Sequence, residues 1–274
     1  MLKVLLGDYP VTAALKSGKI SSKDLPLQFA DVKLPQQAFK RVVRDLEFDL
    51  AELAIVTFLL ARAAGKPYRL LPAVITARFQ HPYLACRSDR YFSPEMLEGK
   101  KIGQRSYSVT TATWLRGILA NDYGVDVSKI RWVTFEEPHV AEFRDPPNVE
   151  RAPAGRQIKQ MLLEGELDAA ILGDPPSDPR LRTVIADPDA AAKAWRAKHG
   201  AIQINHMVVA RNTVSKQVSS KFYDLLFQSR KKAGDPEMNP FGLEENRRNL
   251  EAAIDCVHRQ GMIPRRYEVE ELFE

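Results

Sequence analysis

The sequence lacks the features that mark several classes of protein. It has two cysteines among 274 residues, Cys86 and Cys256, without CxxC spacing, so we expect reduced, buried thiols and no disulfide framework. The longest apolar stretch, residues 50–64, is interrupted by charged side chains and is shorter than the roughly 20 residues that a membrane-spanning helix needs. The apolar run at residues 2–6 is too short for a signal peptide. The sequence therefore predicts a cytoplasmic protein without a membrane span.

Familiar catalytic motifs are absent as well. The chain has no GxGxxG run, no P-loop and no GxSxG elbow, so nucleotide use and serine hydrolysis have no support. Its five histidines show neither an HExxH motif nor any other paired ligand spacing. We expect no metal site and no organic cofactor.

The charge is only mildly basic. Lys and Arg number 40 against 35 Asp and Glu, and the net charge of +5 is spread along the chain. This distribution does not form the basic stripe of a nucleic-acid-binding protein. A small molecule is the expected partner, and association into a homo-oligomer stays open.

Strands and helices alternate along the chain. The predicted strands lie at residues 3–6, 27–32, 48–53, 69–76, 101–104, 130–135, 169–172 and 207–210. One predicted helix begins at residue 35, and the others span residues 55–64, 109–123, 155–164, 189–198, 214–232 and 244–259. Alternation of this kind predicts an α/β fold with largely parallel sheets.

Ligands of such folds collect at the carboxyl ends of the strands, so the residues after each strand are the candidate site. In this chain they form a set of cations, hydroxyls and carboxylates that suits a small organic anion. The set comprises Asp8, Tyr9, Glu52, Arg78, His81, Ser106, Tyr107, Thr110, Thr111, Asp174, Asn205 and His206.

One segment of this set predicts an anion site by itself. Residues 97–119 are typical of a turn, a short strand, a loop with serine and tyrosine hydroxyls, and the start of a helix near Val109. The first N–H groups of a helix lack partners and carry the positive end of its dipole, which suits a carboxylate. Alternatively, Ser108 or Thr110 simply caps the helix. Trp114 and Arg116 fall on different faces of this helix, which predicts that one is packed and the other solvated.

Several motifs together resemble the 4,5-dihydroxyphthalate decarboxylase family over most of the chain. They are Gly7-Asp8-Tyr9, residues 48–53 (FDLAEL), residues 78–81 (RFQH), residues 97–103 (LEGKKIG), residues 110–119 (TTATWLRGIL) and residues 205–209 (NHMVV). The segments 99–103 and 165–171 also resemble type 2 periplasmic binding proteins. That resemblance implies two lobes, each with a mostly parallel sheet flanked by helices, and a ligand cleft between them. It places residues 1–86 and 205–274 in lobe I and residues 87–204 in lobe II.

The resemblance implies loss of CO2 from a hydroxylated aromatic dicarboxylate. Such a reaction needs a proton for the ring carbon, and His81 is the first candidate donor and His206 the second. Arg78 is expected to hold a carboxylate through two parallel N–H bonds, with the hydroxyls of the 106–111 segment at the other end. Glu52 or Asp8 is expected to accept a bond from a substrate hydroxyl.

Purely structural roles remain open for these residues. His81 precedes Pro82 and could merely close a turn, His206 could satisfy a buried carbonyl, and Arg78 could pair with Glu52. The alternative function is a non-catalytic binding protein of the ABC-transporter substrate-binding type for a small organic anion.

Overall fold

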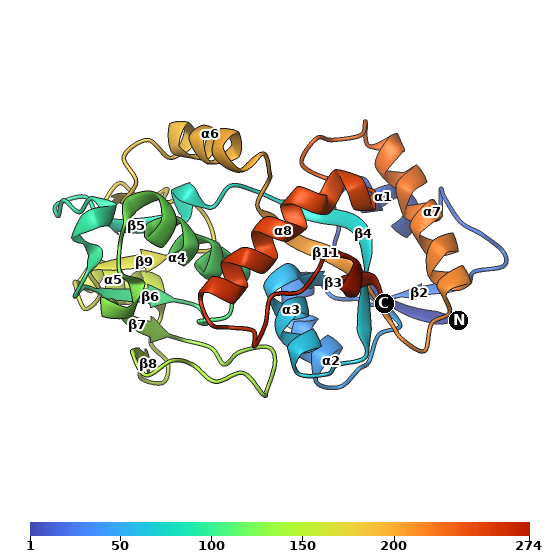
Figure 1. Ribbon diagram of the computed structural model, residues 1–274, viewed down its shortest axis with the longest axis horizontal. Coiled ribbons are helices and arrows are strands. Elements are labelled where there is room, and N and C mark those ends of the chain that lie inside the picture. Colours follow the sequence, from blue (N-terminus) through green and yellow to red (C-terminus); the bar gives the residue numbers. More distant parts are fainter. The chain divides into compact units, whose positions relative to one another are not determined.

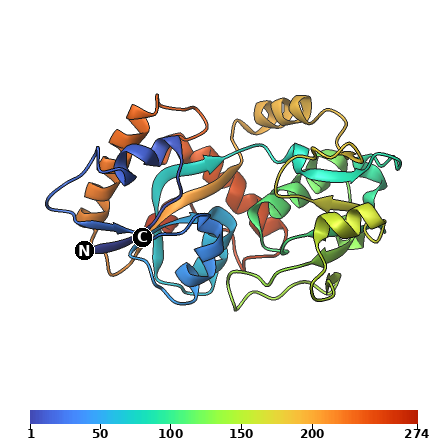
Figure 2. The same ribbon diagram turned by 180° about the vertical axis from the view of Figure 1, so that it is seen from behind.

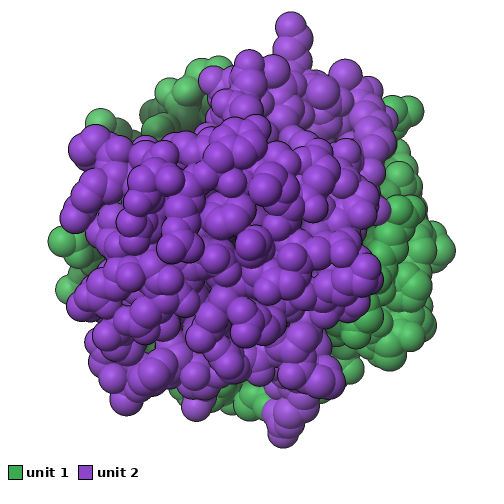
Figure 3. Space-filling view, turned by 90° about the vertical axis from the view of Figure 1, so that its left-hand side faces the viewer, with its two compact units in different colours: residues 1–78, 139–142, 202–274 green, residues 79–138, 143–201 purple.

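The computed structural model describes residues 1–274, which divide into two compact units (Figure 1). Unit 1 comprises residues 1–78, 139–142 and 202–274, and unit 2 comprises residues 79–138 and 143–201 (Figure 3). The first boundary therefore lies at 78/79, ahead of the position expected from the sequence at 86/87. The reason is the strand Leu84–Arg87, which pairs with strands of the second sheet.

Unit 1 is built on a five-stranded sheet of order β2-β1-β3-β11-β4. Its strands are β1 (Leu2–Leu5), β2 (Leu27–Phe29), β3 (Leu50–Ala54), β4 (Tyr68–Ala77) and β11 (Ile204–Arg211). Its helices are α1 (Pro10–Lys16), α2 (Phe39–Val43), α3 (Ile55–Ala63), α7 (Lys216–Lys232) and α8 (Leu243–Arg259). β1 runs parallel to β2 and β3, whereas β11 is antiparallel to β3 and β4.

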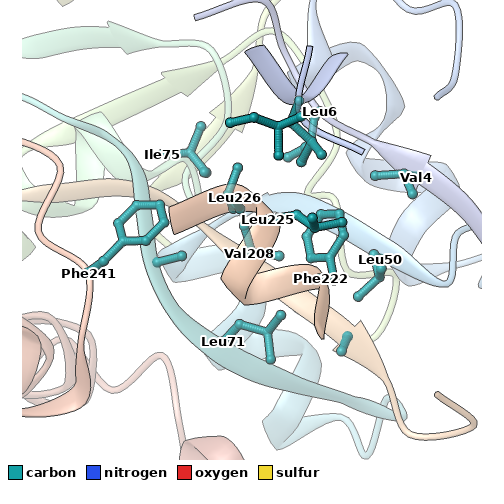
Figure 4. Packing of buried hydrophobic residues seen from close by; sticks show 14 of the residues in the cluster. Val4, Leu6, Leu50, Leu71, Ile75, Val208, Phe222, Leu225, Leu226 and Phe241 are labelled. Atoms are coloured by element: carbon teal, nitrogen blue, oxygen red, sulfur yellow. The ribbon is translucent and has the colours of Figure 1, made fainter. Parts of the chain in front are cut away.

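The main core of unit 1 lies between its sheet and the pair α1 and α7. Leu15 of α1 and Phe222 and Leu226 of α7 pack on buried strand residues such as Leu50 and Val208 (Figure 4). α3 lies against β3, β11 and α8, and its residues 55–61 are all buried, as expected for a short apolar helix that is covered on all sides. Figure 2 shows the same ribbon from behind.

Unit 2 contains a six-stranded sheet of order β10-β5-β9-β6-β7-β8. Its strands are β5 (Leu84–Arg87), β6 (Lys101–Gln104), β7 (Arg131–Thr134), β8 (Val149–Arg151), β9 (Ala169–Ile171) and β10 (Leu181–Thr183). Its helices are α4 (Thr110–Tyr123), α5 (Ile158–Glu164) and α6 (Pro188–His199). The adjacent strands β9, β6, β7 and β8 run parallel to one another, and β5 is antiparallel to both of its neighbours, β9 and β10.

Alternation along β6 separates the two faces of this sheet. Gly103 faces α5 so closely that an added Cβ would lie 3.1 Å from Ile158 Cγ1. Gln104 points the other way, because successive strand residues face opposite sides, and it meets α4 through Arg116. The helix α4 therefore begins directly over the carboxyl end of β6.

Most predicted elements are confirmed, with three kinds of correction. The helix expected from Pro35 is a 3₁₀ turn at Pro35–Ala38 followed by the short α2. The strand expected at residues 69–76 is slightly longer, since β4 runs continuously from Tyr68 through Pro72 to Ala77. The short strands β5, β8 and β10 were not expected, because three or four residues are too few to show a period-2 pattern.

Candidate functional site

The strand ends of unit 1 bring three separate parts of the chain together. β1 and β3 run parallel, with Leu5 beside Ala51, so both end at the same edge of the sheet. β11 runs the opposite way and begins at that edge, where His206 lies beside Ala54. This register places the turn after β1, Glu52 near the end of β3, and His206 near the start of β11 at one edge.

Glu52 is the centre of this site. Its side chain is 0% exposed, and three donors converge on its carboxylate. The Gly7 N–H donates to Oε2 at 2.8 Å, the Tyr9 hydroxyl to Oε1 at 2.8 Å, and His206 Nδ1 lies 2.6 Å from the same Oε1. A buried carboxylate needs such donors, because burial removes its hydrogen bonds to water.

Tyr9 acts on Glu52 as a donor only. Burial, followed by the negative charge of Glu52, raises the pKa of the Tyr9 hydroxyl far above its usual value of 10.0. The phenol therefore keeps its proton at any physiological pH. Its hydrogen bond and that of His206 share one carboxylate oxygen.

The contact with Glu52 determines which ring nitrogen of His206 donates to the carboxylate. A carboxylate only accepts, so Nδ1–H donates to Oε1 and the second ring nitrogen, Nε2, is left for other contacts. Nε2 makes no hydrogen bond within the chain, and the side chain is 16% exposed. The Phe39 ring packs against the imidazole at a centroid distance of 5.1 Å and an angle of 83°. His206 thus has one nitrogen anchored and one available.

The turn between β1 and α1 requires glycine at position 7. A Cβ there would lie 2.7 Å from Tyr9 Cζ and 2.8 Å from Pro35 Cγ. The Tyr9 ring consequently covers the backbone of Gly7, and both residues reach Glu52 from the same turn.

In unit 2, the segment expected to bind an anion forms a loop with buried hydroxyls ahead of α4. Val109, the residue before α4, offers no side-chain cap, and Ser106, Ser108 and Thr110 are all buried around the first turn. The Ser106 and Ser108 hydroxyls lie 3.5 Å apart, and Thr110 Oγ1 makes no hydrogen bond. The alternative that Ser108 or Thr110 caps the helix is therefore wrong.

Arg116 lies beneath this loop. Its guanidinium donates to Gln104 Oε1 at 2.9 Å and to the Tyr107 carbonyl at 2.8 Å, and it stacks on the Tyr107 ring at 3.7 Å. Arg116 is 0% exposed and Trp114 is 3% exposed. The expectation that one of them is solvated is wrong, because the aromatic rings of Tyr107 and Trp132 cover the charge.

His81 occupies a different environment from His206. It begins the 3₁₀ turn His81–Tyr83 in unit 2, is buried, and has no hydrogen bond to its Nδ1. Burial lowers the pKa of its imidazole from 6.5 to about 4. His81 is therefore neutral at physiological pH.

The remaining predicted residues lie apart from these two clusters or at their margins. Asp8 is exposed and forms an ion pair with Lys16 at 2.5 Å, and Asp174 is exposed on the loop after β9. Arg78 follows β4, and Asn205 is buried beside His206 on β11. Tyr107 is packed between Arg116 and Phe143, and Thr111 lies in the first turn of α4. Because the partners of Glu52 are Gly7, Tyr9 and His206, the expected alternative of an Arg78–Glu52 bridge is wrong, as is a carbonyl partner for His206 Nδ1.

Sequence reasoning missed Gly7, Gln104 and Arg116 as parts of these clusters. Gly7 could have been found, because a glycine directly after a strand often marks a close approach of the backbone. A buried arginine inside an amphipathic helix has no comparable signal. The structure contains no group of three or more His, Cys, Asp or Glu side chains that could hold a metal ion, and none of its helices is long and apolar enough to cross a membrane.

Comparison with solved structures identifies the fold. The chain is similar to the alkanesulfonate-binding protein SsuA from Xanthomonas axonopodis pv. citri, with a TM-score of 0.58 and 15% identity over 99% of this chain and 96% of the other. It is equally similar to the periplasmic aliphatic sulphonate binding protein SsuA from Escherichia coli, with a TM-score of 0.58 and 12% identity over the same shares. The expected two-lobed periplasmic-binding-protein fold is confirmed.

Comparison with known sequences identifies the family. No family model matches the chain. A 4,5-dihydroxyphthalate decarboxylase from Comamonas testosteroni is 31% identical over 230 residues, which cover 79% of this chain and 69% of the relative. A protein of the same name from Pseudomonas putida is 31% identical over 208 residues, which cover 71% of this chain and 80% of the relative. The chain belongs to the 4,5-dihydroxyphthalate decarboxylase family.

Proposed function

We propose that this protein is a decarboxylase of a hydroxylated aromatic dicarboxylate, 4,5-dihydroxyphthalate or a close analogue. The observation that carries the proposal is the pairing of His206 with the fully buried Glu52, 2.6 Å apart. A histidine whose one nitrogen is anchored on a carboxylate is a suitable general acid at the other nitrogen. The names of the two relatives supply the substrate class.

His206 delivers the proton in this proposal. Its Nε2–H protonates the ring carbon that bears the carboxylate, assisted by electron donation from the ring hydroxyl para to that carbon. The bond from that carbon to the carboxylate then breaks, its electron pair restores the aromatic ring, and CO2 leaves. Glu52 stabilises the imidazolium before the transfer, and solvent returns a proton to Nε2 afterwards.

His206 is a better candidate than His81 for this step. The lowered pKa of His81 leaves little imidazolium near neutral pH, because burial outweighs the opposing charge of Asp122, and its Nδ1 has no hydrogen-bond partner. His206, by contrast, has its Nδ1 held by the Glu52 carboxylate at 2.6 Å. We therefore assign proton transfer to His206 and a packing role to His81.

The loop at residues 106–111 is the proposed carboxylate site. The hydroxyls of Ser106, Ser108 and Thr110 and the positive end of the 14-residue helix α4 suit an anion. The Arg116 guanidinium adds a fixed positive charge and holds the loop through the Tyr107 carbonyl. Arg78 and Asn205 are the proposed binding residues of unit 1.

A second candidate function is a binding protein for a small organic anion without turnover. The uncapped start of α4 favours it, because that feature explains anion binding without the Glu52–His206 pair. The two functions differ in the role of His206, which transfers a proton in the decarboxylase and has no catalytic role in the binding protein.

The test is CO2 release from 4,5-dihydroxyphthalate, measured beside binding of the same compound by thermal shift. His206→Asn should abolish release while it leaves binding within a few-fold, and His258→Asn serves as the matched control. Binding by the unmodified protein without release would transfer the assignment to the binding function. Release that survives His206→Asn would remove His206 from the mechanism.

A further inference from the structure

Thr12 is a buried polar residue that contacts neither Glu52 nor His206. Its side chain is 0% exposed, and it lies on α1, five residues beyond Gly7. Its hydroxyl donates to the Gly7 carbonyl at 2.7 Å and accepts from the Tyr9 N–H at 3.1 Å. These two bonds join the residues whose own donors reach the carboxylate.

We infer that Thr12 is a positioning residue for the proton donor: its hydroxyl fixes the turn that directs the Gly7 N–H and the Tyr9 hydroxyl onto Glu52, and thereby sets how strongly Glu52 holds the proton on His206. The inference rests on the proposed role of His206. It adds a residue that touches neither the substrate nor the proposed acid.

The geometry leaves the turn few other ways to be held. Gly7 has no side chain, and the Tyr9 ring lies over its backbone. Lys16 also contacts the turn, through the Leu6 carbonyl at 2.9 Å and the Asp8 carboxylate at 2.5 Å, but neither bond joins Gly7 to Tyr9. The Thr12 hydroxyl is the contact that spans from Gly7 to Tyr9.

Thr12 acts on His206 through one atom, Oε1 of Glu52. Tyr9 and His206 share Oε1 of Glu52, so a donor lost from Tyr9 leaves more negative charge facing the imidazole. More negative charge stabilises the imidazolium and retains its proton to higher pH. Besides Glu52 and Tyr9, the titratable groups around the site are His139, which also contacts Phe39, and the ion pair of Asp8 and Lys16.

The experiment compares Thr12→Val, which keeps the shape and removes the hydroxyl, with Thr12→Ser, which keeps the hydroxyl. The first readout is the ring NMR titration of His206 in the ligand-free protein, assigned by its loss in His206→Asn. Thr12→Val should move the titration midpoint upward, in the same direction as Tyr9→Phe. Thr12→Ser should leave it in place.

The second readout is turnover of 4,5-dihydroxyphthalate. Thr12→Val should lower kcat by on the order of tenfold with little change in KM, and Thr12→Ser should restore it. If Thr12→Val titrates like the unmodified protein while Tyr9→Phe shifts, the inference is overturned. If the unmodified protein releases no CO2, the proposed function fails, but the titration still decides the role of Thr12.

Discussion

Replacing Glu52 by glutamine is the most direct perturbation of the proposed acid. The carboxylate accepts from Gly7 at Oε2 and from Tyr9 and His206 at Oε1. A glutamine can meet the fixed Gly7 N–H only with its oxygen, so its NH₂ group must face Tyr9 and His206. Tyr9 can rotate its hydroxyl to accept, whereas His206 must give up the proton on Nδ1 to do so.

The expected magnitude follows from the lost charge-assisted bond. Such a bond contributes roughly 1.5–3 kcal/mol, and about 1.36 kcal/mol corresponds to one pH unit. The neutral amide stabilises the imidazolium less, so the protonated acid is lost at lower pH. We expect the basic limb of the pH–rate profile to move to lower pH, and kcat at pH 7 to fall by roughly 10–10²-fold.

The assay is CO2 release as a function of pH for Glu52→Gln and for Glu268→Gln, a control at an exposed glutamate whose side chain is 75% exposed. Thermal unfolding of both variants checks that the fold is kept. An unchanged profile in a folded Glu52→Gln protein would refute the reasoning, because nothing else in the structure anchors His206 Nδ1.

Three further predictions concern the turn, the loop and the buried histidine. Gly7→Ala places a Cβ against the Tyr9 ring, and we expect urea unfolding to show a loss of about 1–3 kcal/mol, with reduced activity; full stability and activity would contradict the close approach. Arg116→Met leaves the Gln104 and Tyr107 acceptors without a donor, which should lower the free energy of unfolding by roughly 1–3 kcal/mol for each acceptor. It should also weaken anion binding measured by isothermal titration calorimetry; unaltered affinity would show that Arg116 does not support anion binding at the loop. The pKa of His81 is lowered to about 4 in the folded chain, so between pH 6.5 and 4 the unfolded chain binds more protons and stability falls as the pH falls. His81→Gln should flatten this loss by on the order of 2 kcal/mol in denaturation at pH 7 and pH 4.5, and parallel curves would show that His81 is not buried in its neutral form.

The sequence by itself determined most of the elements and the type of fold. Long amphipathic helices such as Lys216–Lys232 and Leu243–Arg259 follow from apolar spacing that only one face of a helix can satisfy. The loop between β6 and α4, our proposed carboxylate site, was predictable as a structural element, because a strand, a run of hydroxyl residues and a helix start are all local features. Local chemistry also predicted that Glu52 and His206 follow or begin strands.

Only the tertiary structure decided which of those residues meet. Glu52 and His206 are 154 positions apart in the chain, and their contact depends on β11 returning antiparallel beside β3, which no local pattern specifies. The same holds for the choice between the two histidines: burial lowers the pKa of His81 to about 4, whereas a carboxylate faces His206. Hydrogen bonding and burial are properties of neighbours in space, so the identity of the candidate acid emerges only when the strands are assembled.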